Sequence, residues 1–109
     1  MVHKVSFSCL HEYDTRESGV TVPIRLSIGT NVVDLTAKVD TGASFCIFQR
    51  GLGEMLGLDI ESGQRQAIST VTGRFVTYGH NVTLSTLGLT FDIMVYFAAD
   101  YTFARDLLG

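Results

Sequence analysis

The sequence contains few of the residues that mark a secreted, disulfide-rich or membrane-spanning protein. Two cysteines, one proline and no tryptophan occur among 109 residues. Cys9 and Cys46 are far apart and have no CxxC spacing, so we expect two buried thiols in a reducing compartment, with a disulfide as the alternative. The N-terminus lacks an apolar run behind a basic start, and no apolar stretch is long enough to span a membrane. These absences predict a cytoplasmic protein without a membrane partner.

The sequence also lacks a large excess of charge of either sign. Eight Lys and Arg residues stand against eleven Asp and Glu residues, the formal net charge is −3, and no block of like charges occurs. Such a chain lacks the electrostatic footprint of a nucleic-acid-binding protein. His3, His11 and His80 lack the spacing of metal ligands. We therefore expect no nucleic acid partner, no metal and no cofactor.

The residues that are present indicate one turn-rich domain over residues 1–109. Apolar residues make up 46% of the chain, and glycine occurs eleven times. This composition suits a compact fold with many turns rather than a disordered tail. The length allows one core but not two lobes with separate cores.

Alternating apolar and polar residues predict a first hairpin. The alternation covers residues 20–28 and again residues 33–39, with a turn at residues 29–31 between them. Pro23 lies within the first arm, which favours an edge position because proline cannot donate to a strand ladder. The second arm leads directly into Asp40.

The rest of the chain predicts further short strands and one short helix. Residues 49–58 hold the only fair helical pattern, with Leu52, Met55 and Leu56 on one face and Gly57 as the stop. The expected strands are residues 46–48, a hairpin over residues 68–77 with Thr72-Gly73 at its tip, residues 81–87 and residues 89–97. Residues 104–109 could begin a second helix. Many short strands with one small helix predict an all-β fold, a compact β-barrel.

The run from Asp40 to Ser44 carries the candidate chemistry. Asp40 ends a half-buried strand, which delivers a carboxylate at a defined place. Thr41 adds a hydroxyl, and Gly42 allows a turn that a Cβ atom would obstruct. Ala43 keeps the loop small, and the Ser44 hydroxyl could hydrogen-bond the carboxylate. We therefore take Asp40, Thr41 and Gly42 as candidate catalytic residues, supported by Ala43 and Ser44.

Hydrolysis of a peptide bond by carboxylates needs two of them sharing one proton, because two like charges at short range do not both ionise. The ionised acid takes a proton from water, and the protonated acid donates to the carbonyl oxygen. The sequence has no second Asp-Thr-Gly, and Asp14-Thr15-Arg16 is the nearest run. The second acid is then expected to be Asp40 of another copy, across a two-fold interface.

The order of these motifs along the chain resembles that of the retropepsins, the single-domain aspartic proteases of retroviruses and their cellular and bacterial relatives. A hairpin leads into Asp-Thr-Gly-Ala-Ser, and a short helix, a flap-like hairpin, a strand pair and a terminal hydrophobic-Gly motif follow. The resemblance implies a closed acid-protease β-barrel with one short helix. It also implies a homodimeric aspartic endopeptidase that binds a peptide or protein substrate beneath its flaps. The flap residues would be Val71, Thr72, Gly73, Arg74 and Phe75.

The terminal motif aligns with the family in two ways. One alignment uses residues 103–108, with Ala104 in place of the usual glycine. The other places Leu107-Leu108-Gly109 on the apolar-apolar-Gly of the family. Neither alignment includes the family's C-terminal interface strand. Residues 2–9 are a candidate for that contact, and the alternative is that the sequence is a fragment of a longer protein.

Simpler interpretations stand beside these. Asp-Thr-Gly can be a turn whose aspartate accepts backbone hydrogen bonds, and Thr72-Gly73 can be an ordinary surface hairpin. The same fold could also serve as a catalytically silent dimerisation or peptide-binding module.

Overall fold

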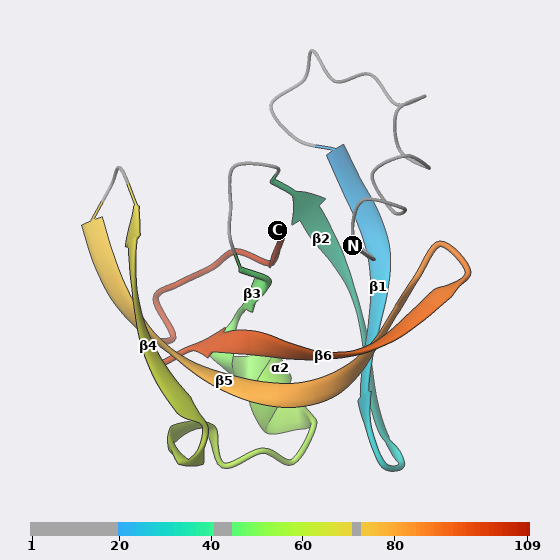
Figure 1. The fold of residues 1–109 in the computed structure, drawn as a ribbon, viewed down its shortest axis with the longest axis horizontal. Helices are drawn as coiled ribbons and strands as arrows, with labels where there is room; N and C mark the ends of the chain where they lie inside the picture. Colours follow the sequence, from blue (N-terminus) through green and yellow to red (C-terminus); the bar gives the residue numbers. More distant parts are fainter. Residues whose placement is uncertain (1–19, 41–44, 71–72) are drawn as a thin grey trace.

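The computed structural model describes residues 20–40, 45–70 and 73–109 (Figure 1). The predictions for residues 1–19, 41–44 and 71–72 lie outside these ranges. Neither helix in the described ranges is both long and apolar enough to cross a membrane.

Strands dominate the structure, as the sequence predicts. The strands are β1 (Val20–Ile28), β2 (Asn31–Val39), β3 (Ile47–Phe48), β4 (Gln64–Thr70), β5 (Gly73–Thr86), β6 (Leu89–Ala98) and β7 (Leu107–Leu108). Their order is β1-β2-β7-β3-β6-β5-β4, and an additional pairing of β1 with β5 closes six of them into a ring. One short helix, α2 (Arg50–Met55), and a 3-10 turn, η1 (Ile60–Ser62), complete the described elements. The all-β class is confirmed.

The first hairpin forms where the alternation predicts it. β1 and β2 pair from Val20↔Val39 to Ile28↔Asn31, and Gly29 turns the chain with a φ of +58°. Pro23 is not on an edge strand, because β1 lies between β2 and β5. It is tolerated because the pairing of β1 with β5 begins at Arg25.

The second hairpin differs from the prediction in two ways. Thr70 pairs with Gly73, so Gly73 already belongs to β5 and is not part of the tip. The separately predicted strand over residues 81–87 is the continuation of β5. Gly79 lies inside this strand and does not interrupt it. A Cβ atom at Gly79 would lie 2.9 Å from Met94 Sδ and 2.9 Å from Tyr96 Cε2. Glycine is needed at this position for packing, not for a turn.

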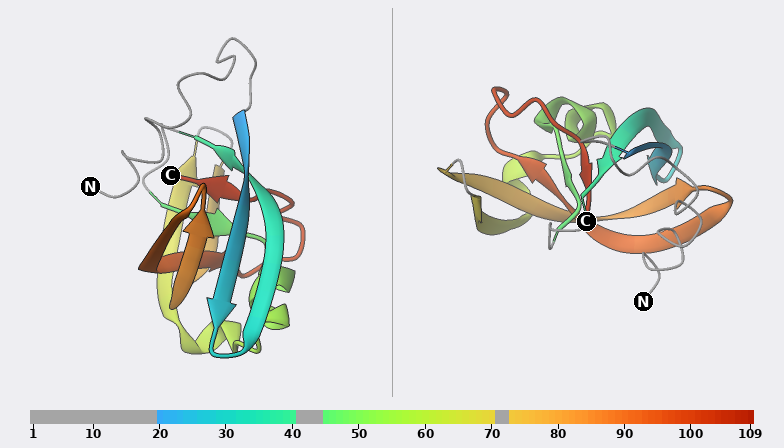
Figure 2. Two further views of the ribbon diagram at one scale, coloured as in Figure 1. Left: turned by 90° about the vertical axis from the view of Figure 1, so that its right-hand side faces the viewer. Right: turned by 90° about the horizontal axis from the view of Figure 1, so that it is seen from above.

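The helix expected at residues 104–109 is absent, and Leu107–Leu108 is a strand instead. Its residues pair in parallel with Lys38 and Val39 of β2, while Leu107 pairs with Ile47 of β3. A strand at this place satisfies backbone groups of both neighbours, which a helix would leave without partners. Figure 2 shows the C-terminal segment meeting the ends of β2 and β3 in both views.

Helix α2 is shorter than the predicted range 49–58, and the prediction that Met55 belongs to its apolar face is wrong. Leu56 is buried and Leu52 packs against the core, but Met55 is 67% exposed. Gly57 ends the helix as predicted, with a φ of +83°. The Asn31 side chain donates to the Leu56 carbonyl oxygen at 3.0 Å, so the first hairpin caps the end of the helix.

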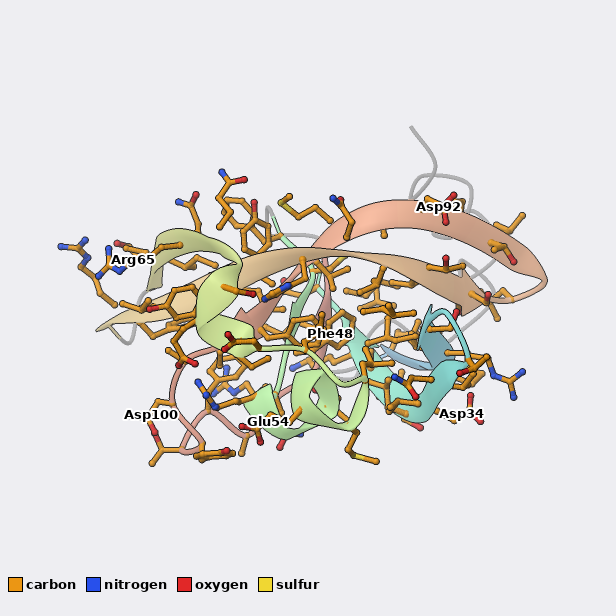
Figure 3. The ribbon with its side chains drawn as sticks, turned by 90° about the horizontal axis from the view of Figure 1, so that it is seen from below. Asp34, Phe48, Glu54, Arg65, Asp92 and Asp100 are labelled. Atoms are coloured by element: carbon orange, nitrogen blue, oxygen red, sulfur yellow. The ribbon has the colours of Figure 1, made fainter. Side chains whose placement is uncertain are left out.

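The core lies between the curved sheet and α2. Phe48 and Phe97 are fully buried, with ring centroids 6.1 Å apart, and Phe48 occupies the centre of Figure 3. Cys46 is buried with a free thiol, as expected; Cys9 lies outside the described residues.

Candidate active site

Asp40 follows β2 directly and is held there by the C-terminal strand. Its backbone N–H donates to the Leu108 carbonyl oxygen at 3.0 Å, and the Lys38 N–H donates to the Asp106 carbonyl oxygen at 2.8 Å. Asp40 is half-buried. The end of β2 and the C-terminus lie together in Figure 1. The parallel strands β2 and β7, which are far apart in the sequence, therefore fix the backbone position of Asp40.

The predicted partners Thr41, Gly42, Ala43 and Ser44 lie outside the described residues. The chain after them is anchored on β6. Phe45 packs edge-on against Tyr96 with ring centroids 5.0 Å apart, and the Tyr96 N–H donates to the Cys46 carbonyl oxygen at 2.9 Å. Both ends of this loop are thus tied to rigid strands, which suits a site that must hold its groups in place.

The Cys46 thiol lies close to the site but is unsuited to nucleophilic chemistry. Its Sγ donates to the Gly109 carbonyl oxygen at 4.0 Å. Burial raises the pKa of this thiol, and the reactive thiolate is correspondingly disfavoured.

The β4–β5 hairpin holds the described part of the predicted flap; Val71 and Thr72 lie outside the described residues. Gly73 has a φ of +142° and Arg74 is exposed. Phe75 stacks on Phe103, with ring centroids 4.8 Å apart and an interplanar angle of 26°. Since neighbouring strand residues point to opposite faces, Arg74 faces away from this stack.

One segment, residues 99–106, joins the hairpin to the Asp40 strand. At its start the Ala99 N–H donates to the Val76 carbonyl oxygen of β5 at 2.9 Å. Phe103 makes the ring stack with Phe75, and the carbonyl oxygen of Asp106 pairs with β2. The sequence singled out Asp40 and the flap residues separately, and the structure links them through this segment.

Helix α2 holds the outer side of the same segment. Arg50 donates to the Ala99 carbonyl oxygen at 3.1 Å and to Glu61 at 2.9 Å, and its guanidinium lies 5.4 Å from the centre of the Tyr101 ring. The hydrogen bond to Glu61 is the main reason that the pKa of Arg50 is raised. Tyr101 also donates to Glu54. The sequence interpretation assigned no role to these residues.

The strand β7 is held by the Asp106 side chain, whose contact with Gln49 the sequence did not predict. The Asp106 carboxylate accepts hydrogen bonds from the backbone N–H and the side-chain Nε2 of Gln49, both at 3.0 Å. The alignment of residues 103–108 with the family places Asp106 on a position that carries Asp or Asn, but it does not indicate that Gln49 binds this carboxylate.

Five further described carboxylates have partners away from Asp40. Arg25 binds Asp34, Arg50 binds Glu54 and Glu61, Thr83 donates to Asp92, and the Thr102 N–H donates to Asp100. Figure 3 shows Asp34, Glu54, Asp92 and Asp100 at the periphery of the molecule. Within the described ranges, no three His, Cys, Asp or Glu residues gather as metal ligands would.

Comparison with known proteins relates this geometry to one family. The sequence model described as aspartyl protease matches residues 22–101. Among solved structures, EIAV protease complexed with the inhibitor HBY-793 is similar, with a TM-score of 0.68 and 20% sequence identity. That match covers 89% of this chain and 86% of the retroviral protease. No curated protein sequence matches the chain.

Proposed function

Because the chain belongs to the aspartyl protease family and has a retropepsin-like fold, we propose that it is an aspartic endopeptidase that works as a homodimer. Asp40 of each copy supplies one carboxylate of the dyad. The ionised carboxylate accepts a proton from the attacking water, and the protonated one donates to the substrate carbonyl oxygen. Thr41 and Gly42 hold the geometry of the loop, and Ala43 and Ser44 support it.

The observation that carries the proposal is the position of Asp40. It lies at the end of a strand whose last two residues pair with β7, and its own N–H continues that ladder. A carboxylate at the end of a rigid strand is held in a fixed position, and general acid–base catalysis requires such a position. The family of the chain supplies the chemistry that such a carboxylate performs.

The partners of the described carboxylates support the proposal of a second copy. Asp106 is the acid nearest to Asp40 along the β2–β7 ladder, but its carboxylate accepts two hydrogen bonds from Gln49. The remaining described carboxylates with named partners are bound elsewhere on the molecule. A symmetric partner would supply the second carboxylate from its own Asp40.

The substrate is proposed to be an extended peptide lying between Asp40 and the β4–β5 hairpin. An extended peptide can form main-chain hydrogen bonds with strands, and its side chains then meet the apolar groups beside them. Ile68 and Phe75 pair across the hairpin and make this face of the flap apolar; Ile68 is buried and Phe75 stacks on Phe103, so the exposed part of Phe75 is what this pair offers to a peptide. Arg74 lies on the opposite face and is expected to contribute less to substrate binding.

The test is digestion of a mixed peptide library at several pH values, with Asp40→Asn beside the wild type. We expect the wild type to cleave most efficiently at mildly acidic pH, where one proton is shared by the dyad. Asp40→Asn should lower kcat/KM by on the order of 10³-fold or more, since it removes the general base. Asp92→Asn is the matched control, because it changes the charge equally on an exposed strand and keeps an acceptor for Thr83.

Oligomeric state separates this proposal from a catalytically silent binding module. Sedimentation at high protein concentration should show a dimer, and a statine-type transition-state mimic should block cleavage. A strict monomer that cleaves no peptide in the library would refute the protease proposal and favour the binding module.

A further inference from the structure

We infer that Asp106 is a positioning residue that fixes the backbone of Asp40 through the strand β7. Its effect on catalysis rests on the proposed function, whereas its effect on the Asp40 backbone rests on the geometry alone. Asp106 lies 66 positions after Asp40 in the 109-residue sequence and outside the Asp-Thr-Gly loop.

The contacts form a continuous path from one carboxylate to the other. The carboxylate of Asp106 accepts from the N–H and the Nε2 of Gln49, while its carbonyl oxygen accepts from the Lys38 N–H. Two residues later, the Leu108 carbonyl oxygen accepts from the Asp40 N–H. Releasing the Asp106 side chain therefore loosens the strand that holds the first backbone group of the candidate catalytic residue.

Gln49 is a firm anchor for this purpose. It is the residue at the N-cap of α2, and its carbonyl oxygen accepts from the Leu52 N–H at 3.1 Å. Its side chain makes no capping hydrogen bond to the helix, although this position usually carries a side chain that does. The side-chain amide is instead directed to Asp106, so the start of the helix is fastened to β7.

β7 depends on such a fastening because it is short. It consists of Leu107 and Leu108 and pairs with β3 at a single position, Ile47↔Leu107. A two-residue strand has few ladder hydrogen bonds of its own, and the two bonds to a charged carboxylate are individually stronger than neutral ones. The side chain of Asp106 thus supplies a large share of what keeps β7 in place.

The experiment compares Asp106→Ala and Asp106→Asn in the full chain. The alanine variant removes both acceptors. The asparagine variant keeps one acceptor, and its amide can meet the Gln49 side chain if that amide rotates. Asn31→Ala is the matched control, because it removes a half-buried bond between a side chain and the backbone, to Leu56, at the far end of β2.

The first measurement is amide hydrogen exchange, which needs no activity. We expect exchange of the Lys38 and Asp40 amides to accelerate about tenfold or more in Asp106→Ala, because local opening of β7 becomes easier. Asp106→Asn should fall between the alanine variant and the wild type. The control should leave these two amides unchanged relative to the rest of β2.

The second measurement is the division between kcat and KM for a cleaved peptide. Misplacement of Asp40 should lower kcat about tenfold to a hundredfold with a smaller change in KM, and the asparagine variant should recover part of the loss. Unchanged exchange at Asp40 in both Asp106 variants would overturn the positioning role, whatever the activity. If the wild type cleaves nothing, the protease proposal fails instead, and the exchange result still decides the role of Asp106.

Discussion

Two glycines of helix α2 offer a sharp test of how this helix packs. Gly51 and Gly53 are two residues apart in the same six-residue helix. A Cβ atom on Gly51 would meet nothing within 4 Å, whereas one on Gly53 would lie 2.5 Å from Ile60 Cδ1 and 3.0 Å from the Phe97 ring. We expect Gly51→Ala to stabilise the protein and Gly53→Ala to leave its stability level or lower it.

The magnitudes follow from two opposing effects. Replacing glycine by alanine inside a helix gains about 1 kcal/mol at either site. At Gly53 the methyl group enters a closed space, since Ile60 is 1% exposed and Phe97 is fully buried. Overpacking of this kind costs about 1–3 kcal/mol. The gain in propensity is common to both variants, so the difference between them isolates the steric cost and should be about 1–3 kcal/mol.

The assay is urea unfolding of the wild type and both variants, followed by circular dichroism. All three must be measured at one protein concentration, because association shifts the apparent stability. The midpoint should rise for Gly51→Ala and fall or stay level for Gly53→Ala, with equal slopes. If both variants were stabilised to the same extent, the close approach of α2 to Ile60 and Phe97 would be refuted.

Two further predictions concern a turn and an ion pair. Gly88 has a φ of +79°, and a Cβ atom built there would have nothing within 4 Å. Gly88→Ala should therefore lower the free energy of unfolding by about 1 kcal/mol through backbone strain alone. Thermal unfolding measures this change, and a stabilised variant would contradict the left-handed turn. Arg50 hydrogen-bonds Glu61 and holds the pKa of Glu61 below its ordinary range. The stability from this pair is therefore present above about pH 4.3 and is lost as the pH falls through the lower folded value. In urea unfolding between pH 7 and pH 3, Glu61→Gln should show a shallower acid loss than the wild type; identical curves would mean that the pair contributes nothing.

The local patterns of the sequence were sufficient for much of the fold. The first hairpin and the late strand β6 follow from alternation, because a strand with one buried face repeats every two residues. Gly57 was correctly predicted to end the helix, since the left-handed conformation found there is the one glycine adopts without strain. The predictions that failed depend on contacts between distant segments. The strand predicted separately over residues 81–87 continues the hairpin arm before it, because β5 pairs with β6 along residues 77–86, and Met55 is exposed although it resembles a core residue.

The candidate site divides in the same way. The sequence by itself determined that Asp40 would end a strand, because the alternation of residues 33–39 and the Asp-Thr-Gly that follows are both local. It also indicated that a second Asp-Thr-Gly is absent. Only the tertiary structure decided what holds Asp40: the C-terminal residues form β7, which pairs with β2, and Asp106 fastens β7 to Gln49. Leucines at residues 107 and 108 suit a helix as well as a strand, and the choice depends on backbone partners that lie some seventy residues earlier in the chain.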